Sequence, residues 1–177
     1  MRKKNKLSNK ISIKKFCPNL SSSIQERWQR VFDFCIQEAR NPDNETYIAV
    51  SNKKPCAILT YHRQKTKNNY LDGVCAIPDE EGEKTPLAGR TLIYQLFKDS
   101  NQSNDKRGIV LEAIHNGPVN VIDKYEKLGF TAISSDGNYT LMTCNKFKVA
   151  EELKKFKNEI EYIETDPEKI DSKEFID

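Results

Sequence analysis

A tyrosine near the end of a predicted helix is the side chain best suited to donate a proton. Tyr125 begins the run Tyr125-Glu126-Lys127-Leu128-Gly129-Phe130, in which Gly129 takes the position of a left-handed helix cap. A phenol has a pKa of about 10, so it stays protonated at neutral pH and can donate to a developing anion. The alternative interpretation is a core aromatic residue on a helix that ends at an ordinary cap.

Candidate proton acceptors lie in and after the short apolar segment 108–114. Glu112 is within this predicted strand and His115 follows it. Imidazole needs little tuning to accept a proton near neutral pH, whereas a glutamate needs burial to raise its pKa. For each residue the alternative is a solvated or hydrogen-bonded structural role. Asp72 and His62 rank below them as candidate bases.

The start of another predicted helix could bind an anion. Thr85 can cap this helix and Pro86 fits its first position, where a missing N–H costs nothing. Amides at a helix start point outward and the helix dipole favours anions, so a diphosphate is well accommodated there. Lys84 and Arg90 would add positive charge. The alternative is an ordinary capped helix.

The five cysteines are Cys17, Cys35, Cys56, Cys75 and Cys144, and no two of them form a C-x-x-C pair. This spacing supports neither a disulfide framework nor a zinc site, and we expect no bound metal. The sequence contains no recognisable Ser/His/Asp or Cys/His arrangement, so covalent catalysis by one of these nucleophiles is not the default. We therefore interpret the cysteines as small apolar residues in a reducing compartment.

Apolar periodicity and turn residues predict one mixed α/β domain. The predicted order is strand, helix, three antiparallel strands, helix, strand, helix, two strands and a final helix. Its first helix starts at the capping box of Ser23 and Glu26, and the cluster 41–44 ends it. The other segments are strands at 10–16, 46–50, 56–62, 70–77, 108–114, 130–134 and 139–144, helices after Pro86 and Pro118, and a helical pattern from Phe147 to Ile163 that Pro167 would end.

Length and charge narrow the class of protein. A chain of 177 residues with 37% apolar residues suffices for one core. It has no apolar run of the roughly 18 residues that a membrane-spanning helix needs, so we expect a cytoplasmic protein with no membrane partner. The net charge is only +3, with basic residues crowded at the front. This pattern does not favour a nucleic-acid partner.

The order of elements resembles the fold of the GNAT (acetyl-CoA-dependent N-acetyltransferase) superfamily over roughly residues 10–145. The segment Tyr125 to Phe130 resembles the end of a family helix, and Lys84 to Ile93 resembles the family's pyrophosphate loop, [QR]-x-x-G-x-[GA]. The resemblance implies a mostly antiparallel sheet flanked by helices. We divide the chain into a basic tail (1–9), a GNAT-like domain (10–145) and an appended helix with an acidic tail (146–177).

The resemblance also implies roles for particular residues. Tyr125 would be the general acid that protonates the departing coenzyme thiolate. The pantetheine arm would lie along Val74, Cys75, Ala76 and Ile77, where a strand amide would polarise the thioester carbonyl. The diphosphate would lie at Lys84, Leu87, Ala88, Gly89 and Arg90, and Asn116 would touch the pantetheine. Leu87 replaces the family's first glycine and Pro86 removes an amide, so this loop departs from the pattern.

The resulting hypothesis is an N-acetyltransferase that transfers an acetyl group from acetyl-CoA, its cosubstrate, directly to an amine. The acceptor is not identified by the sequence. Two alternatives stay open: a GNAT-like module that binds coenzyme A without catalysis, and an acetyltransferase acting on charged tRNA or a protein amine. A homodimer is also left open.

Overall fold

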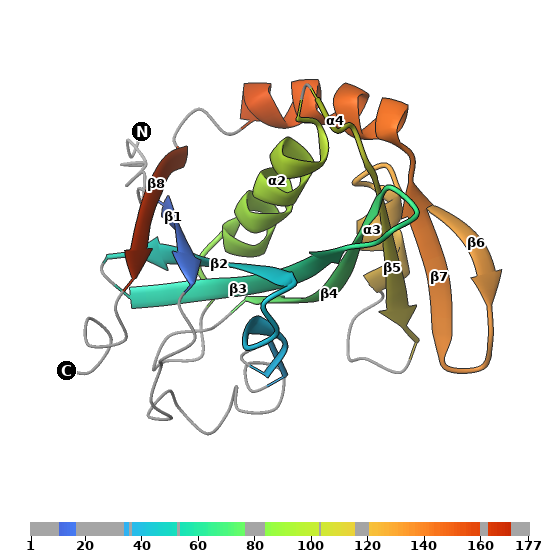
Figure 1. Ribbon diagram of the computed structural model, residues 1–177, viewed down its shortest axis with the longest axis horizontal. Coiled ribbons are helices and arrows are strands. Elements are labelled where there is room, and N and C mark those ends of the chain that lie inside the picture. Colours follow the sequence, from blue (N-terminus) through green and yellow to red (C-terminus); the bar gives the residue numbers. More distant parts are fainter. Residues whose placement is uncertain are drawn as a thin grey trace, which may run out of the picture.

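The computed structural model describes residues 11–16, 34–35, 37–52, 54–76, 84–102, 104–115, 121–159 and 163–170 (Figure 1). For residues 11–16, 157–159 and 163–170 it describes the backbone alone. The predicted start of the first helix at Ser23 therefore lies outside the described residues, whereas residues 34–35 and 37–39 are helical, as predicted.

The described strands form one eight-stranded sheet in the order β6-β7-β5-β4-β3-β2-β1-β8. Neighbours are antiparallel except for β4 with β5 and β1 with β8. The strands are β1 (Ile11–Phe16), β2 (Asn44–Ser51), β3 (Lys54–Arg63), β4 (Asn68–Ala76), β5 (Gly108–Ile114), β6 (Thr131–Ser135), β7 (Tyr139–Cys144) and β8 (Ile163–Ile170). The predicted α/β class and the three consecutive antiparallel strands are confirmed.

Three labelled helices accompany the sheet: α2 (Ala88–Ser100), α3 (Val121–Glu126) and α4 (Lys146–Glu159). In Figure 1, α2 lies above the strands β2 to β4 and α4 crosses above α2. Their apolar faces meet around Phe97, whose ring contacts Phe130 edge-on at 6.0 Å and Phe156 at 5.4 Å between centroids. The core thus lies between one face of the sheet and these helices. No helix in the described part of the chain is long and apolar enough to span a membrane.

The end of α3 has the predicted left-handed cap. Gly129 has φ +91°, Phe130 N donates to Tyr125 O at 3.0 Å, and Gly129 N donates to Glu126 O at 3.0 Å. These two bonds form a Schellman motif. A Cβ on Gly129 would come within 2.6 Å of the Glu152 Cγ atom of α4. Glycine is required here both by its backbone conformation and by the close approach of α4.

The C-terminal elements differ from the prediction. Asn145 caps α4, because its Oδ1 accepts hydrogen bonds from the amides of Phe147 and Lys148, both at 3.0 Å. The helix ends at Glu159, so the expectation of a helix up to Ile163 was wrong, and residues 163–170 form β8. Pro167 lies where the register of β8 with β1 is irregular, on an outer strand of the sheet. A proline is tolerated at such a place because it leaves few ladder bonds unmade.

We predict that Gly129→Ala lowers the free energy of unfolding by about 1–3 kcal/mol, because alanine is strained at positive φ and its Cβ meets Glu152. Urea unfolding would measure the change. Gly137→Ala is the matched control, since a Cβ there meets nothing within 4 Å. It should change stability by less than about 0.5 kcal/mol. Equal effects of the two substitutions would contradict the proposed role of Gly129.

Candidate active site

Strands β4 and β5 pair over only part of their length. Their parallel ladder runs from Asn68 opposite Gly108 to Leu71 opposite Leu111 and then stops, although β4 continues to Ala76 and β5 to Ile114. Figure 1 shows the two strands diverging. Beyond Leu71 and Leu111 their facing backbone edges do not pair with each other. Such edges can hydrogen-bond an extended ligand as an added strand would.

A β-bulge lies directly at the end of that ladder. In the register of β3 with β4, Thr60 pairs with Gly73 and Tyr61 with Leu71, which leaves Asp72 as the extra residue. Bulges re-aim a side chain and are frequent beside active sites. Here the carboxylate of Asp72 lies 2.9 and 3.0 Å from Nδ1 of His62. The isolated Gly73 next to Asp72 is a weak sequence signal for a bulge, but it does not show that His62 would be the partner of Asp72.

The His62–Asp72 pair is chemically competent to accept a proton. A carboxylate can only accept hydrogen bonds, so Nδ1 of His62 donates to Asp72, and in the neutral ring Nε2 carries the lone pair. The ring stacks on Tyr70 with centroids 5.2 Å apart, which fixes its plane. Burial raises the pKa of Asp72, and the hydrogen bond from His62 opposes that rise. The side chain of His62 is one-third exposed, so a ligand can reach it.

The two predicted bases occupy different surroundings. Glu112 is exposed and follows directly after the last residue of β5 that pairs with β4. Burial and the neighbouring Glu112 carboxylate raise the pKa of Tyr70 to about 12, so Glu112 lies near the His62–Asp72 pair. His115 lies beyond the end of β5, where its Nε2 contacts the hydroxyls of Thr140 and Ser135. The strand register therefore places Glu112, but not His115, at the end of the ladder.

Tyr125 lies half-buried in α3 with its ring edge-on to Phe130, at 5.6 Å between centroids. Burial raises the pKa of Tyr125 to about 12, so the phenol stays protonated over the whole physiological range. Its hydroxyl has no hydrogen-bond partner in the described part of the chain. The phenolic hydroxyl is therefore a proton donor that no described residue engages in a hydrogen bond. The ring of Tyr125 also packs against the core, as the alternative interpretation of the sequence expects, and its catalytic role stays a prediction.

The predicted anion loop begins α2 two residues later than expected. Leu87, not Thr85, is the N-cap residue, and no side chain caps the helix. Leu87 has φ +66°, the left-handed conformation that favours the glycine the GNAT pattern has at this position. Thr91 N donates to Leu87 O at 2.8 Å and Ala88 N to Thr85 O at 3.3 Å. Gly89 and Arg90 follow in the first turn of the helix, where the helix dipole favours an anion.

The other residues implied by the resemblance lie on both sides of this loop. Val74, Cys75 and Ala76 lie in the part of β4 that does not pair with β5, while Ile77 and Asn116 lie outside the described residues. A Cβ on Gly89 would meet nothing within 4 Å, so the helix start is open to a ligand. Lys84 is exposed beside it. A hydrogen bond with Cys35 and the charge of Lys84 lower the pKa of Cys75, against its burial.

Metal ligands do not gather in this region. Among the residues that the structure describes, no group of three or more His, Cys, Asp and Glu side chains could hold a metal ion. The chemistry that these residues support is proton transfer and anion binding next to an open strand edge.

Several solved structures of similar architecture carry names of acetyltransferases. The IAA acetyltransferase from Bacillus cereus ATCC 14579 matches with a TM-score of 0.57 at 12% identity, over 76% of this chain and 99% of that one. FdhC in its apo form, a nucleotide-linked sugar GNAT, matches with a TM-score of 0.56 at 14% identity, over 84% of this chain and 93% of that one. The N-acetyltransferase PseH of Campylobacter jejuni, in complex with acetyl coenzyme A, matches with a TM-score of 0.55 at 14% identity, over 76% of this chain and 98% of that one.

No protein-family model and no curated protein matches the sequence. At these identities the likeness is one of architecture, which in this chain is a mostly antiparallel sheet flanked by helices. The chain therefore has the GNAT fold, as the sequence predicted.

We predict that Leu87→Gly raises the free energy of unfolding by about 0.5–1 kcal/mol, because it removes left-handed strain from a side chain that is 58% exposed. Urea unfolding would measure the gain. Ile133→Gly is the control, since Ile133 is 60% exposed but does not have a positive φ. It should lower stability, because glycine gains entropy on unfolding. A loss of stability in Leu87→Gly as large as in Ile133→Gly would show that Leu87 is not strained.

Proposed function

We propose that this protein transfers an acetyl group from acetyl-CoA directly to an amine. One observation carries the proposal: the backbone edges of β4 and β5 separate after Leu71 and Leu111, beside the start of α2, within a GNAT fold. Supporting it, the similarly folded PseH is an N-acetyltransferase with acetyl coenzyme A bound, and the similarly folded Bacillus cereus protein is an acetyltransferase.

The described residues fit coenzyme A. The unpaired edge of β4 at Val74, Cys75 and Ala76 would hold the pantetheine arm, with the neighbouring Ile77 and Asn116 still predicted to contribute. The amides of Gly89 and Arg90 would bind the diphosphate, with Ala88 and Leu87 shaping the loop and Lys84 adding charge. The coenzyme supplies an activated thioester. An amide of the open edge of β4 would polarise its carbonyl group.

Two side chains would move protons. His62, held by Asp72 at the end of the ladder, would accept the proton of the incoming amine. Glu112 and His115 remain the other predicted acceptors, and Glu112 lies next to Tyr70. Tyr125 would donate its phenolic proton to the departing thiolate. The amine attacks the carbonyl carbon, the carbon–sulfur bond breaks, and the products are an amide and a free thiol.

A module that binds the coenzyme without catalysis is the second candidate. It is favoured by the strained Leu87 and by Pro86, because both departures from the pyrophosphate pattern weaken the loop. The two candidates make the same prediction for binding and opposite predictions for turnover.

Acetyl-CoA should raise the melting temperature of the protein. A ligand at about 100 times its dissociation constant adds roughly 2.7 kcal/mol to the stability of the folded state. Thermal unfolding with and without millimolar acetyl-CoA measures the effect, and acetyl phosphate, which lacks the pantetheine and nucleotide, is the control. A melting temperature that acetyl-CoA leaves unmoved would overturn the proposal and the binding-module alternative together.

Tyr125→Phe should lower turnover by about 10²- to 10⁴-fold while coenzyme affinity and melting temperature stay nearly constant, because only the donor is removed. Free thiol released from acetyl-CoA, with a primary amine that the wild-type protein acetylates, gives the rate. Tyr139→Phe, on an exposed tyrosine of β7, is the control and should not change it.

The same assay separates the proton acceptors. His62→Gln should reduce turnover more than Glu112→Gln or His115→Gln. Full turnover in Tyr125→Phe when chemistry limits the rate would make Tyr125 a packing residue. A wild-type protein that binds acetyl-CoA but releases no thiol with any amine would favour the binding module.

A further inference from the structure

A cavity of about 330 Å³ lies where α2, α4 and the end of α3 meet. This volume is at the lower end of the range for small-molecule sites. Its walls carry four cations, Arg90, Lys127, Lys148 and Lys155, against two carboxylates, Glu126 and Glu152. The charge of the cavity favours an anionic occupant. None of the α4 residues lies in the part of the sequence that resembles the GNAT family.

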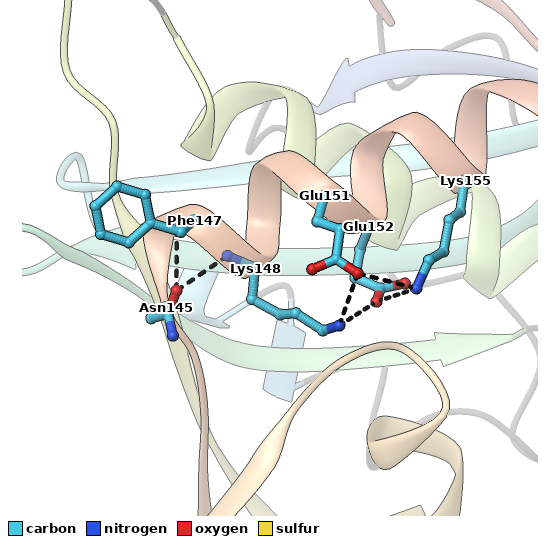
Figure 2. Close-up of polar contacts among 6 residues, drawn as sticks. All are labelled: Asn145, Phe147, Lys148, Glu151, Glu152 and Lys155. Carbon is cyan, nitrogen blue, oxygen red and sulfur yellow. Dashed lines mark hydrogen bonds and ion pairs between the residues drawn. The ribbon is translucent and has the colours of Figure 1, made fainter.

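Two lysines are fixed at the wall of this cavity by one buried carboxylate. Glu152 has a side chain only 9% exposed and lies 3.0 Å from Nζ of Lys148 and 2.8 Å from Nζ of Lys155. Figure 2 shows both ammonium groups converging on it from opposite sides, with Glu151 as a further, more exposed partner. Burial alone would raise the pKa of Glu152, but the two lysines hold it below its usual value. The ammonium groups are therefore held in place and stay charged.

These lysines keep donors for a further partner. An ammonium group has three N–H donors, and the contacts with Glu151 and Glu152 use at most two of them on each lysine, so at least one donor remains on each. Lys148 and Lys155 remain 37% and 56% exposed, so an anion can approach them from the cavity. The contact with Glu152 reduces the entropy that each lysine would lose on binding.

Arg90 connects this cavity to the proposed coenzyme site. It belongs to the first turn of α2, where the diphosphate would bind, and its guanidinium lies 5.2 Å from the ring centroid of Phe156 in α4. Phe156 also lines the cavity, but its ring is buried in the core, so Arg90 rather than the ring faces a ligand there. In coenzyme A the group that follows the diphosphate is an adenosine carrying a 3′-phosphate. A coenzyme whose diphosphate lies at Gly89 and Arg90 would bring that group to the cavity.

We propose that this cavity binds the phosphorylated adenosine end of coenzyme A and that Lys148 and Lys155 contact its 3′-phosphate. The inference rests on the proposed function, and it makes α4 a part of the coenzyme site. A phosphate monoester carries nearly two negative charges at neutral pH, which the fixed lysines match. Arg90, which lines the cavity and begins α2, would lie between the diphosphate and the adenosine.

The test compares coenzyme A with dephospho-coenzyme A, which lacks only the 3′-phosphate, by calorimetric titration of the full-length protein. Wild type should bind coenzyme A at least about tenfold more tightly, the size of a charge-assisted hydrogen bond. Lys148→Ala should lose most of this preference, while Lys155 still pairs with Glu152. Lys154→Ala, on an exposed lysine of the same helix, should keep it.

Equal affinities of wild type for the two coenzymes, or an unchanged preference in Lys148→Ala, would overturn the inference and leave the proposed function intact. Binding of neither coenzyme would instead overturn the proposed function. A measurement without any variant covers the case in which Lys148→Ala does not fold: adenosine 3′,5′-bisphosphate should compete with coenzyme A better than ADP does. Equal competition by the two nucleotides would also overturn the inference.

Discussion

The geometry of the candidate site depends on one constraint, the early end of the ladder between β4 and β5. The two strands must pair to join the two halves of the sheet, and they do so for the four residue pairs from Asn68–Gly108 to Leu71–Leu111. Each then follows its antiparallel neighbour, β4 along β3 and β5 along β7. Because neighbouring strands twist relative to one another, and because the bulge at Asp72 bends β4 further, the two halves diverge. The open backbone, the His62–Asp72 pair and Glu112 all lie where this divergence starts.

The helices stabilise the opened sheet from one side. Phe97, Phe130 and Phe156 come from α2, from the residue after the α3 cap and from α4, and their rings pack edge to face. Gly129 lets the end of α3 approach Glu152, whose carboxylate in turn orders two lysines. Removing either the glycine or the carboxylate would therefore alter packing and electrostatics together, since the same atoms take part in both.

The sequence predicted elements whose signals are local. The cap at Gly129, the order of strands and helices and the position of Tyr125 follow from apolar spacing and turn residues. Features that depend on pairing between distant segments were not predicted: the bulge that turns Asp72 toward His62, the left-handed Leu87, and β8 in place of an acidic tail. Leu87 stands where the pyrophosphate pattern has a glycine, but the sequence does not show whether a leucine there keeps the left-handed backbone that a glycine favours. The segment of β8 has a charged, proline-containing sequence with low strand propensity. Its strand conformation depends on its pairing with β1.

The pairing of β1 with β8 has a consequence for how the protein folds. These strands come from the two opposite ends of the described chain and lie side by side in parallel. Contacts between residues so distant in sequence form slowly, because a long loop must close before they contribute any stability. The sheet from β2 to β7 can assemble from nearer segments first, so we expect β8 to dock late. An edge strand that docks last also detaches most readily from the sheet. We therefore expect the backbone amides of β8 and of its pairing with β1 to be the least protected of the sheet against hydrogen exchange.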